Sequence, residues 1–211
     1  SEFLGDKNLQ LQVFLVAHTA PGFEQNIKFT DLSTRGFRLS YPNDLIRTHV
    51  SYREFGENYK PAVGFSRRNG FKRMQPSLSY HPRPKNYEFI RQLEFGLQYE
   101  YMTDLNDKML KKEITITPLN IRFESQDEIG VKVVALSEFL DNPFDIYAGI
   151  MIPVSEYKSK EVQFKFETSE KRMVSTELEY QTGDFWNGKK QTLKTQISVK
   201  PFTGFNIQTE Y

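Results

Sequence analysis

Cysteine is absent from this sequence, tryptophan occurs once, and the charges almost cancel, with 28 Lys and Arg against 27 Asp and Glu in 211 residues. Without cysteine, neither a disulfide framework nor a thiolate metal site can form. A net charge of +1 gives no electrostatic reason to expect nucleic acid or an acidic polymer as the main partner. We therefore expect a fold held together by packing and backbone pairing, without a nucleic-acid partner.

Long hydrophobic runs are also missing. No stretch approaches the roughly 20 apolar residues that a membrane-spanning helix needs, and the mean hydropathy is −0.59. A helical membrane protein is therefore excluded, whereas a membrane barrel is not, because its alternating strands average out as hydrophilic. Residues 1–6 lack the basic and apolar regions of a signal peptide. Residues 206–211 stop inside a strand-like alternation, so we expect a fragment of a longer chain.

The sequence is instead rich in alternating apolar and polar residues, most clearly from residue 161 to 211. Four successive runs carry an apolar residue or a threonine at every second position, which is typical of strands whose two faces meet different surroundings. A turn over residues 183–189 separates the second run from the third. These positions are Val162, Phe164 and Phe166; Val174, Thr176, Leu178 and Tyr180; Leu193, Thr195, Ile197 and Val199; Phe205, Ile207, Thr209 and Tyr211.

The rest of the chain repeats this plan, and we expect roughly ten to twelve strands of about ten residues. Short connections predict antiparallel neighbours, because a parallel crossover needs a dozen or more residues. We therefore predict an all-β, antiparallel up-and-down meander in one domain spanning residues 1–211. The apolar positions change parity across Pro118, which predicts a bulge or bend there. Strands are expected at 8–17, 36–41, 45–55, 71–80, 88–103, 109–124, 128–136 and within 143–152, a short embedded strand in 56–70, a short helix at 137–142 and a loop at 153–160.

Two surroundings fit such a sheet. In a soluble β-sandwich the apolar face is a core, whereas in an outer-membrane β-barrel it meets lipid and the polar face lines the lumen. The expected strand length and the long side chains of both signs on the polar faces favour the barrel, or part of one. Aromatic residues expected near strand ends favour it too, although cross-strand aromatic pairs give a similar pattern. The charged residues are Lys165, Glu167, Glu177, Glu179, Lys194 and Lys200, and the aromatic ones Tyr99, Tyr101, Phe123, Tyr147, Tyr157, Tyr180 and Trp186.

Several short motifs occur in a fixed order. They are residues 60–68 (KPAVGFSRR), 82–84 (PRP) with 90–91 (IR), 142–144 (NPF) with 152–153 (IP), and 183–188 (GDFWNG). In these motifs the chain resembles an uncharacterised bacterial family, the β-rich domain that follows a family-9-like carbohydrate-binding domain in outer-membrane-associated proteins of Gram-negative bacteria. The resemblance implies a barrel-like domain, a signal peptide and glycan-binding module upstream, and further strands downstream. The family has no established active site.

A basic cluster surrounds Gly70 and is a candidate interface. It combines Arg67, Arg68, Lys72 and Arg73 with the later residues Arg83 and Lys85. Such a cluster is suited to lipid head-group phosphates or an anionic glycan. The alternative is a charged loop whose cations pair with nearby Glu. The turn that holds Phe185 and Trp186 is a second candidate, able to stack on a sugar, to anchor at a membrane interface, or simply to pack on its own strands.

Support for an enzyme is slight. Glu177 and Glu179 share one strand face about 7 Å apart, which is loosely compatible with a glycosidase pair but common on any polar face. His18, His49 and His81 lie in unlike contexts, so a metal site would require them to converge by folding. There is no Gly-x-Ser-x-Gly elbow and no phosphate-binding loop. We expect no catalytic residue and no cofactor, and a glycoside hydrolase is the one enzyme class with any residue-level support.

The sequence thus predicts a non-enzymatic β-barrel segment in the cell outer membrane, acting as anchor or pore for a surface protein that handles glycans. Its expected partners are outer-membrane lipid, a glycan bound through the upstream module, and other outer-membrane proteins. The alternative is a soluble β-sandwich that binds carbohydrate in the periplasm or outside the cell.

Overall fold

The structure is a computed structural model that describes residues 8–18, 27–61, 68–147, 150–186 and 188–211. Strands dominate the described residues, and the one helical element is the 3-10 turn η1 (Phe29–Leu32). In this part of the chain no helix is long and apolar enough to cross a membrane. The strands are β1 (Gln10–Ala17), β2 (Ser33–Pro42), β3 (Ile46–Phe55), β4 (Phe71–Tyr80), β5 (Ile90–Asp104), β6 (Met109–Phe123), β7 (Glu128–Phe139), β8 (Phe144–Tyr147), β9 (Ile150–Ile152), β10 (Glu156–Glu167), β11 (Val174–Phe185), β12 (Gly188–Phe202) and β13 (Phe205–Glu210).

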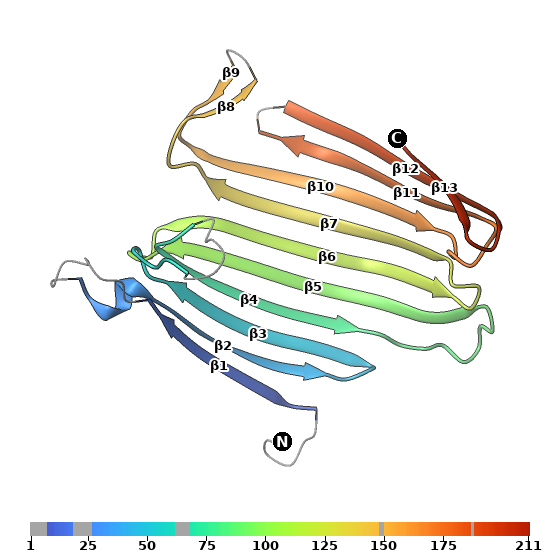
Figure 1. Cartoon of the computed structure of the whole chain (residues 1–211), viewed down its shortest axis with the longest axis horizontal. Helices are drawn as coiled ribbons and strands as arrows, with labels where there is room; N and C mark the ends of the chain where they lie inside the picture. Colours follow the sequence, from blue (N-terminus) through green and yellow to red (C-terminus); the bar gives the residue numbers. More distant parts are fainter. Residues whose placement is uncertain (1–7, 19–26, 62–67, 148–149, 187) are drawn as a thin grey trace. The chain divides into compact units, whose positions relative to one another are not determined.

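Eleven of these strands form one sheet in the order β1-β2-β3-β4-β5-β6-β7-β10-β11-β12-β13, and β8 and β9 form a separate hairpin between β7 and β10 (Figure 1). Strands of the sheet that follow one another in the chain are therefore neighbours, and the pairs β1–β2, β2–β3, β10–β11, β11–β12 and β12–β13 are antiparallel. The predicted all-β, up-and-down antiparallel meander is confirmed. Among the described residues no pairing joins β1 to β13, the two ends of the strand order.

The chain divides into two compact units. The first unit comprises residues 1–78, 98–113 and 137–156, and the second unit comprises residues 79–97, 114–136 and 157–211. Strands β1, β2 and β3 belong to the first unit, and β11, β12 and β13 belong to the second.

The three longest connections between strands follow strands of one direction. In a meander every second connection leaves the sheet at the same end. The long connections 18–32, 56–70 and 140–155 follow β1, β3 and β7, which run in one direction, although the connections after β5 and β11, at residues 105–108 and 186–187, are short. Of the connections that follow strands of the opposite direction, those at residues 43–45, 124–127 and 203–204 are short turns, and the longest is residues 81–89.

Two predicted elements between β7 and β10 are wrong. Residues 137–142 do not form a helix, because 137–139 continue β7, and residues 153–160 are not a loop, because β10 begins at Glu156. Pairing with the following segment explains both differences. Ser137 Oγ donates to Glu156 Oε1 at 2.7 Å, and the Leu140 N–H donates to the Ser155 carbonyl at 3.1 Å. A one-turn helix would lose these hydrogen bonds, and forming the first turn of a helix is itself unfavourable.

The predicted turn at 183–189 is also too long, because β11 runs to Phe185 and β12 starts at Gly188, directly opposite it. The pairing of Asp184 with Lys189, whose side chains form a 3.1 Å ion pair, extends the ladder to a two-residue turn. The bulge or bend predicted at Pro118, which lies inside the strand β6, stays a prediction. The short strand expected within 56–70 falls largely outside the described residues.

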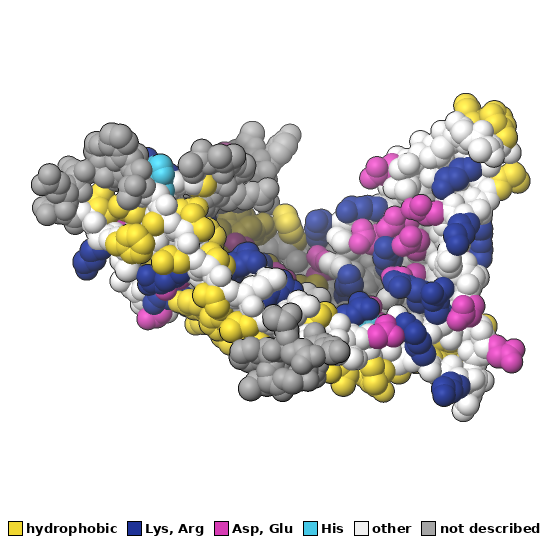
Figure 2. Space-filling model, turned by 60° about the horizontal axis from the view of Figure 1, so that its bottom comes forward, with side chains coloured by type: hydrophobic (Ala, Val, Ile, Leu, Met, Phe, Trp, Pro, Cys, Tyr) yellow, Lys and Arg dark blue, Asp and Glu magenta, His cyan; other side chains and the backbone are white. Residues whose placement is uncertain are grey.

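Few hydrophobic side chains are buried among the described residues. Those buried are Leu32, Tyr59, Phe71, Leu110 and Ile152, while the buried polar residues are Ser33, Thr34, Ser51, His81, Thr103, Thr117, Ser169, Ser175 and Ser198. Hydrophobic side chains accordingly lie at the surface (Figure 2).

Candidate functional site: the polar face of the sheet

The registers of β10, β11 and β12 assign each side chain in the second unit to a face. Residues opposite each other in an antiparallel pair point to the same side of the sheet. Phe164 is opposite Tyr180, which in turn is opposite Leu193, so these three share the apolar face. Lys165 is opposite Glu179, which is opposite Lys194, so these share the polar face. The alternation in the sequence therefore becomes two chemically distinct surfaces.

Exposure on the two faces is the reverse of that in a soluble sheet. On the apolar face Phe164 is 45% exposed and Leu193 50% exposed. On the polar face the cross-strand partners Ser175 and Ser198 are only 7% and 8% exposed. The first unit behaves in the same way, since Val13 of the apolar face is 73% exposed. Apolar side chains therefore lie uncovered, while small polar side chains are the ones enclosed.

Ion pairs cross the polar face of the second unit. Lys165 Nζ lies 2.8 Å from Glu167 Oε2 and 3.3 Å from Glu177 Oε1. Lys194 Nζ lies 3.6 Å from Glu179 Oε2 on the neighbouring strand. These long side chains intermix at the surface, where Figure 2 shows cationic and anionic groups side by side. Each lysine is thus held by carboxylates of the same face, and the charges of this ladder compensate one another.

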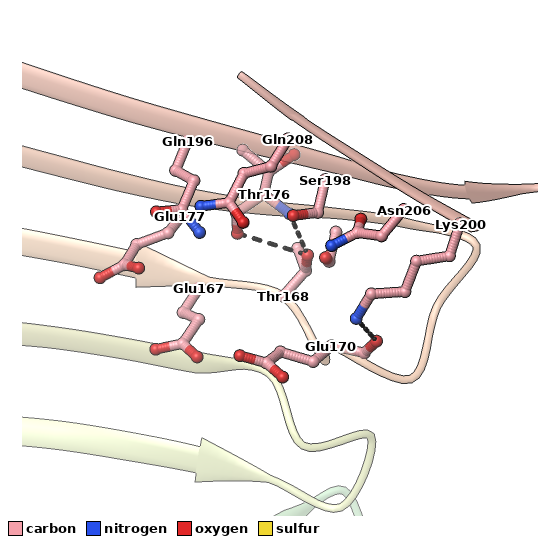
Figure 3. Close-up of a pocket in the computed structure, with 11 residues that line it drawn as sticks. Glu167, Thr168, Glu170, Thr176, Glu177, Gln196, Ser198, Lys200, Asn206 and Gln208 are labelled. Atoms are coloured by element: carbon pink, nitrogen blue, oxygen red, sulfur yellow. Dashed lines mark hydrogen bonds between the residues drawn. The ribbon is translucent and has the colours of Figure 1, made fainter. Parts of the chain in front are cut away.

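A hollow beside this ladder is lined by carboxylate, carboxamide and hydroxyl groups (Figure 3). Glu167 and Glu177 bound one side of it, and Gln196 and Gln208 project from β12 and β13 on the other. At its end Lys200 Nζ donates to the Glu170 carbonyl at 2.8 Å. No aromatic side chain lines the hollow, so it lacks the ring platform on which sugars stack.

Three arginines gather on the polar face of the first unit. Arg38 is opposite Ser51 and Gly36 is opposite Arg53, so Arg38 and Arg53 are diagonal neighbours on one face of β2 and β3. Arg73 of β4 belongs to this face as well, because Ser77, four residues along β4, bonds His49 of the same face at 2.6 Å. Arg38 and Arg73 both lie close enough to repel Arg53 electrostatically. We call Arg38, Arg53 and Arg73 the arginine trio.

The predicted basic cluster is divided by the structure. Arg68 Nη2 lies 2.8 Å from Asp141 Oδ2, and Lys72 Nζ lies 2.7 Å from Asp107 Oδ1. Lys72 and Arg73 are successive residues of β4 and therefore point to opposite faces. Arg83 and Lys85 follow the far end of β4. Arg67 lies outside the described residues. Of the cluster, Arg73 joins the polar face, together with Arg38 and Arg53, which the sequence analysis did not select.

Phe185 and Trp186 lie at the two-residue turn between β11 and β12. The Trp186 ring packs edge-on against Tyr157, with centroids 4.9 Å apart, and Trp186 has a left-handed backbone with φ of 54°. Phe185 is 42% exposed, and Lys190 Nζ lies 5.5 Å from the centre of its ring. Trp186 is therefore partly covered by Tyr157 of β10, and Phe185 offers the more open ring.

The groups considered for catalysis or metal binding are separately engaged. Glu177 lies beside Lys165 and Glu179 beside Lys194, so the two carboxylates of the predicted pair are each salt-bridged. His49 bonds Ser77, and His81 bonds Ser79 at 2.8 Å. Within the described ranges no group of three or more His, Cys, Asp or Glu side chains is arranged to hold a metal ion. These carboxylates and histidines are thus each held in an ion pair or a hydrogen bond.

Asp127 ties together two turns of the second unit. Its Oδ1 accepts the Ser169 N–H at 2.9 Å, and its Oδ2 accepts bonds from Ser125 Oγ at 2.7 Å and Arg172 Nη2 at 2.5 Å. The hydrogen bond from Ser125 and the Ser169 amide, with the charge of Arg172, lower the pKa of the Asp127 carboxyl. The turns 124–127 and 168–173 are thereby joined through one carboxylate.

Aromatic side chains also mark the strand ends in this unit. Phe123, the last residue of β6, stacks on Phe89, just before β5, at 6.4 Å, and Phe202 stacks on Phe205 across the β12–β13 turn at 5.2 Å. Tyr180, by contrast, lies in the middle of β11.

Comparison with protein-family models, with curated proteins and with solved structures finds no match to this chain.

Proposed function

We propose that this chain is a non-enzymatic segment of an outer-membrane β-barrel, with its apolar face against lipid and its polar face toward a water-filled interior. It would serve as the anchor or pore of a surface protein that handles glycans, with lipid and other outer-membrane proteins as its partners. The mechanism is passive. Strand pairing satisfies the backbone within the bilayer, and the charged face determines which solutes lie favourably inside.

The reversed exposure of the two faces carries this proposal. Burying an apolar side chain contributes about 25 cal/mol per Å², so a soluble fold would not leave Phe164, Leu193 and Val13 uncovered while enclosing serines. Lipid supplies the missing apolar surroundings without a second protein layer. In barrels of this class, lipid-facing and interior-facing residues alternate along every strand.

Strand length and connection length support the same conclusion. A tilted membrane-crossing strand needs about 9–11 residues, and β2, β3 and β4 have 10 each while β7, β10 and β11 have 12 each. Outer-membrane barrels have short turns at the periplasmic end and longer loops outside. On that basis the connections 18–32, 56–70 and 140–155 face the cell exterior.

Charged groups at one end of the first unit mark a boundary of the apolar band. Arg35 and Glu54 belong to the apolar face by register, and their side chains pair at 2.6 Å near the ends of β2 and β3. Lys72 and Asp107 pair at the corresponding ends of β4 and β5. A charged rim followed by apolar residues is the profile expected where a strand passes from head groups into hydrocarbon.

The second candidate is a soluble β-sandwich that binds carbohydrate, and the open ring of Phe185 is the observation in its favour. A sandwich requires a second sheet on the apolar face. Among the described strands the only other sheet is the hairpin of β8 and β9, with four and three residues. The barrel segment is therefore the better-supported function.

Expression without detergent tests the proposal. We expect the 211-residue chain to be recovered from inclusion bodies or membranes, and to acquire sheet structure by circular dichroism only in micelles or vesicles. A monodisperse, sheet-rich monomer in plain buffer, with a sedimentation coefficient independent of detergent, would contradict it and favour the sandwich.

A further inference from the structure

The arginine trio gathers three neighbouring cations on one face without a counter-ion among the described residues. Several other cations of the described strands pair with carboxylates, as Arg35 does with Glu54 and Arg122 with Glu128. Arg38, Arg53 and Arg73 make no ion pair and no side-chain hydrogen bond within the part of the chain that the structure describes. Three positive charges therefore lie together uncompensated.

The neighbours of the trio cannot supply the missing charge. Across the sheet from Arg53 lie Gly36 and then Phe14, neither of which carries charge. Glu100 of β5, which contacts β4 through Gln75, is already engaged: it accepts a hydrogen bond from Gln75 and forms a 3.1 Å ion pair with Lys111. Repulsion among the three guanidinium groups is therefore not relieved by the sheet itself.

Arg73 provides the second observation. Its Nε atom is buried and has no hydrogen-bond partner among the described residues. A buried donor without a partner costs about 1–3 kcal/mol, and more when it is charged. Nε is enclosed and cannot itself bond a solute, so an anion from outside the chain lowers this cost through its charge near the guanidinium group.

We propose that the arginine trio binds a small oxyanion, a carboxylate- or phosphate-bearing solute, on the polar face of β2, β3 and β4. The planar guanidinium fork matches both groups in bidentate geometry. Because the trio lies on the face opposite Leu39 and Val50, the ligand is a dissolved solute rather than a lipid head group. The inference goes beyond the barrel segment, and binding itself does not require membrane insertion.

The test uses the whole chain refolded in a non-ionic detergent, with inorganic phosphate and citrate as probes and sodium chloride to hold ionic strength constant. We expect both probes to raise the unfolding temperature in a saturable manner. Arg53→Gln should weaken the apparent Kd about tenfold or more, the loss expected for a charge-assisted hydrogen bond. Arg53→Lys, which keeps the charge but not the fork, should weaken it less.

Arg47→Gln is the matched control, because Arg47 lies on the same face of β3 about 20 Å from Arg53 by strand rise. It should leave the Kd unchanged. Equal affinities in wild type, Arg53→Gln and Arg47→Gln, or no saturable response in wild type, would overturn the site. Competition by a short-chain anionic phospholipid, at concentrations where free phosphate has no effect, would overturn the assignment to a dissolved solute. Failure of either kind leaves the detergent dependence of folding, and hence the barrel proposal, separately measurable.

Discussion

The polar faces of the two units differ in how the charges of their lysine and arginine side chains are compensated. In β10, β11 and β12 the lysines stand opposite or beside carboxylates, so that Lys165 alone contacts both Glu167 and Glu177. In β2, β3 and β4 the arginine trio is left without a carboxylate. In β10, β11 and β12 the charges neutralise one another within the face, so their role is structural. In β2, β3 and β4 the charges of the arginine trio remain available to a ligand. Charged residues on a polar face therefore have to be judged by their pairing, not by their number.

The largest expected effect concerns the apolar face of the second unit. Phe164→Arg should destabilise the protein in lipid by about 2–4 kcal/mol, as a cation on the lipid-facing side of a barrel strand does. Gln163→Arg, one residue away on the polar face, should cost far less. Urea unfolding in phospholipid vesicles measures both. Equal losses for the two variants would show that the faces of β10 do not meet different surroundings.

The comparison of the polar faces predicts opposite effects for the same loss of charge. Lys165→Gln leaves Glu167 and Glu177 directly opposite each other, and like charges in that position are destabilising. We expect a loss of about 0.5–1 kcal/mol, since the groups are partly exposed. The double variant Lys165→Gln with Glu177→Gln should recover most of it.

Arg53→Gln, in contrast, should leave the stability in ligand-free, low-salt buffer unchanged or raise it by a few tenths of a kcal/mol, because it removes like-charge repulsion. The same urea titrations measure this variant. A loss equal to that of Lys165→Gln would mean that the arginine trio is a paired structural element, and the contrast between the two units would fail.

The smallest expected effect is local and depends on pH. The folded pKa of Asp127 is lowered below its ordinary value of 3.8, so its contribution is fully present above that value. It is lost as the pH falls through the lower, folded pKa. Asp127→Asn should increase the rate of proteolysis within residues 168–173 at neutral pH and abolish the acid sensitivity of that turn. Ser125→Ala, which removes one of the donors to Asp127, should give a weaker form of the same change.

Much of the fold follows from local alternation. The strands at β3, β4 and β6 could be predicted to within two residues because turn-forming residues bound each of them. Local pattern failed between β7 and β10, where Ser137 and Leu140 are held by partners in the next segment. It also failed at the β11–β12 turn, where cross-strand pairing extends to Phe185.

The candidate site was less predictable for the same reason. Residues 67–73 form a cluster in the sequence, yet alternation sends Lys72 and Arg73 to opposite faces of β4. Arg38 and Arg53 come together only through the register of β2 with β3. Alternation alone could have shown that Arg38 points to the other face of the sheet from Phe37 and Leu39. It could not have shown which arginine of the next strand lies beside Arg38.

The absence of native cysteine makes the central claim directly measurable. Single cysteines at residues 162–167 of β10 can carry a nitroxide label, and its collision rates with oxygen and with a water-soluble nickel complex report lipid and water. In vesicles we predict a period of two, with oxygen accessibility highest at 162, 164 and 166 and nickel accessibility highest at 163, 165 and 167. Labels at 164 and 166 that are reached by nickel, or that are shielded from both reagents as in a protein core, would contradict the account.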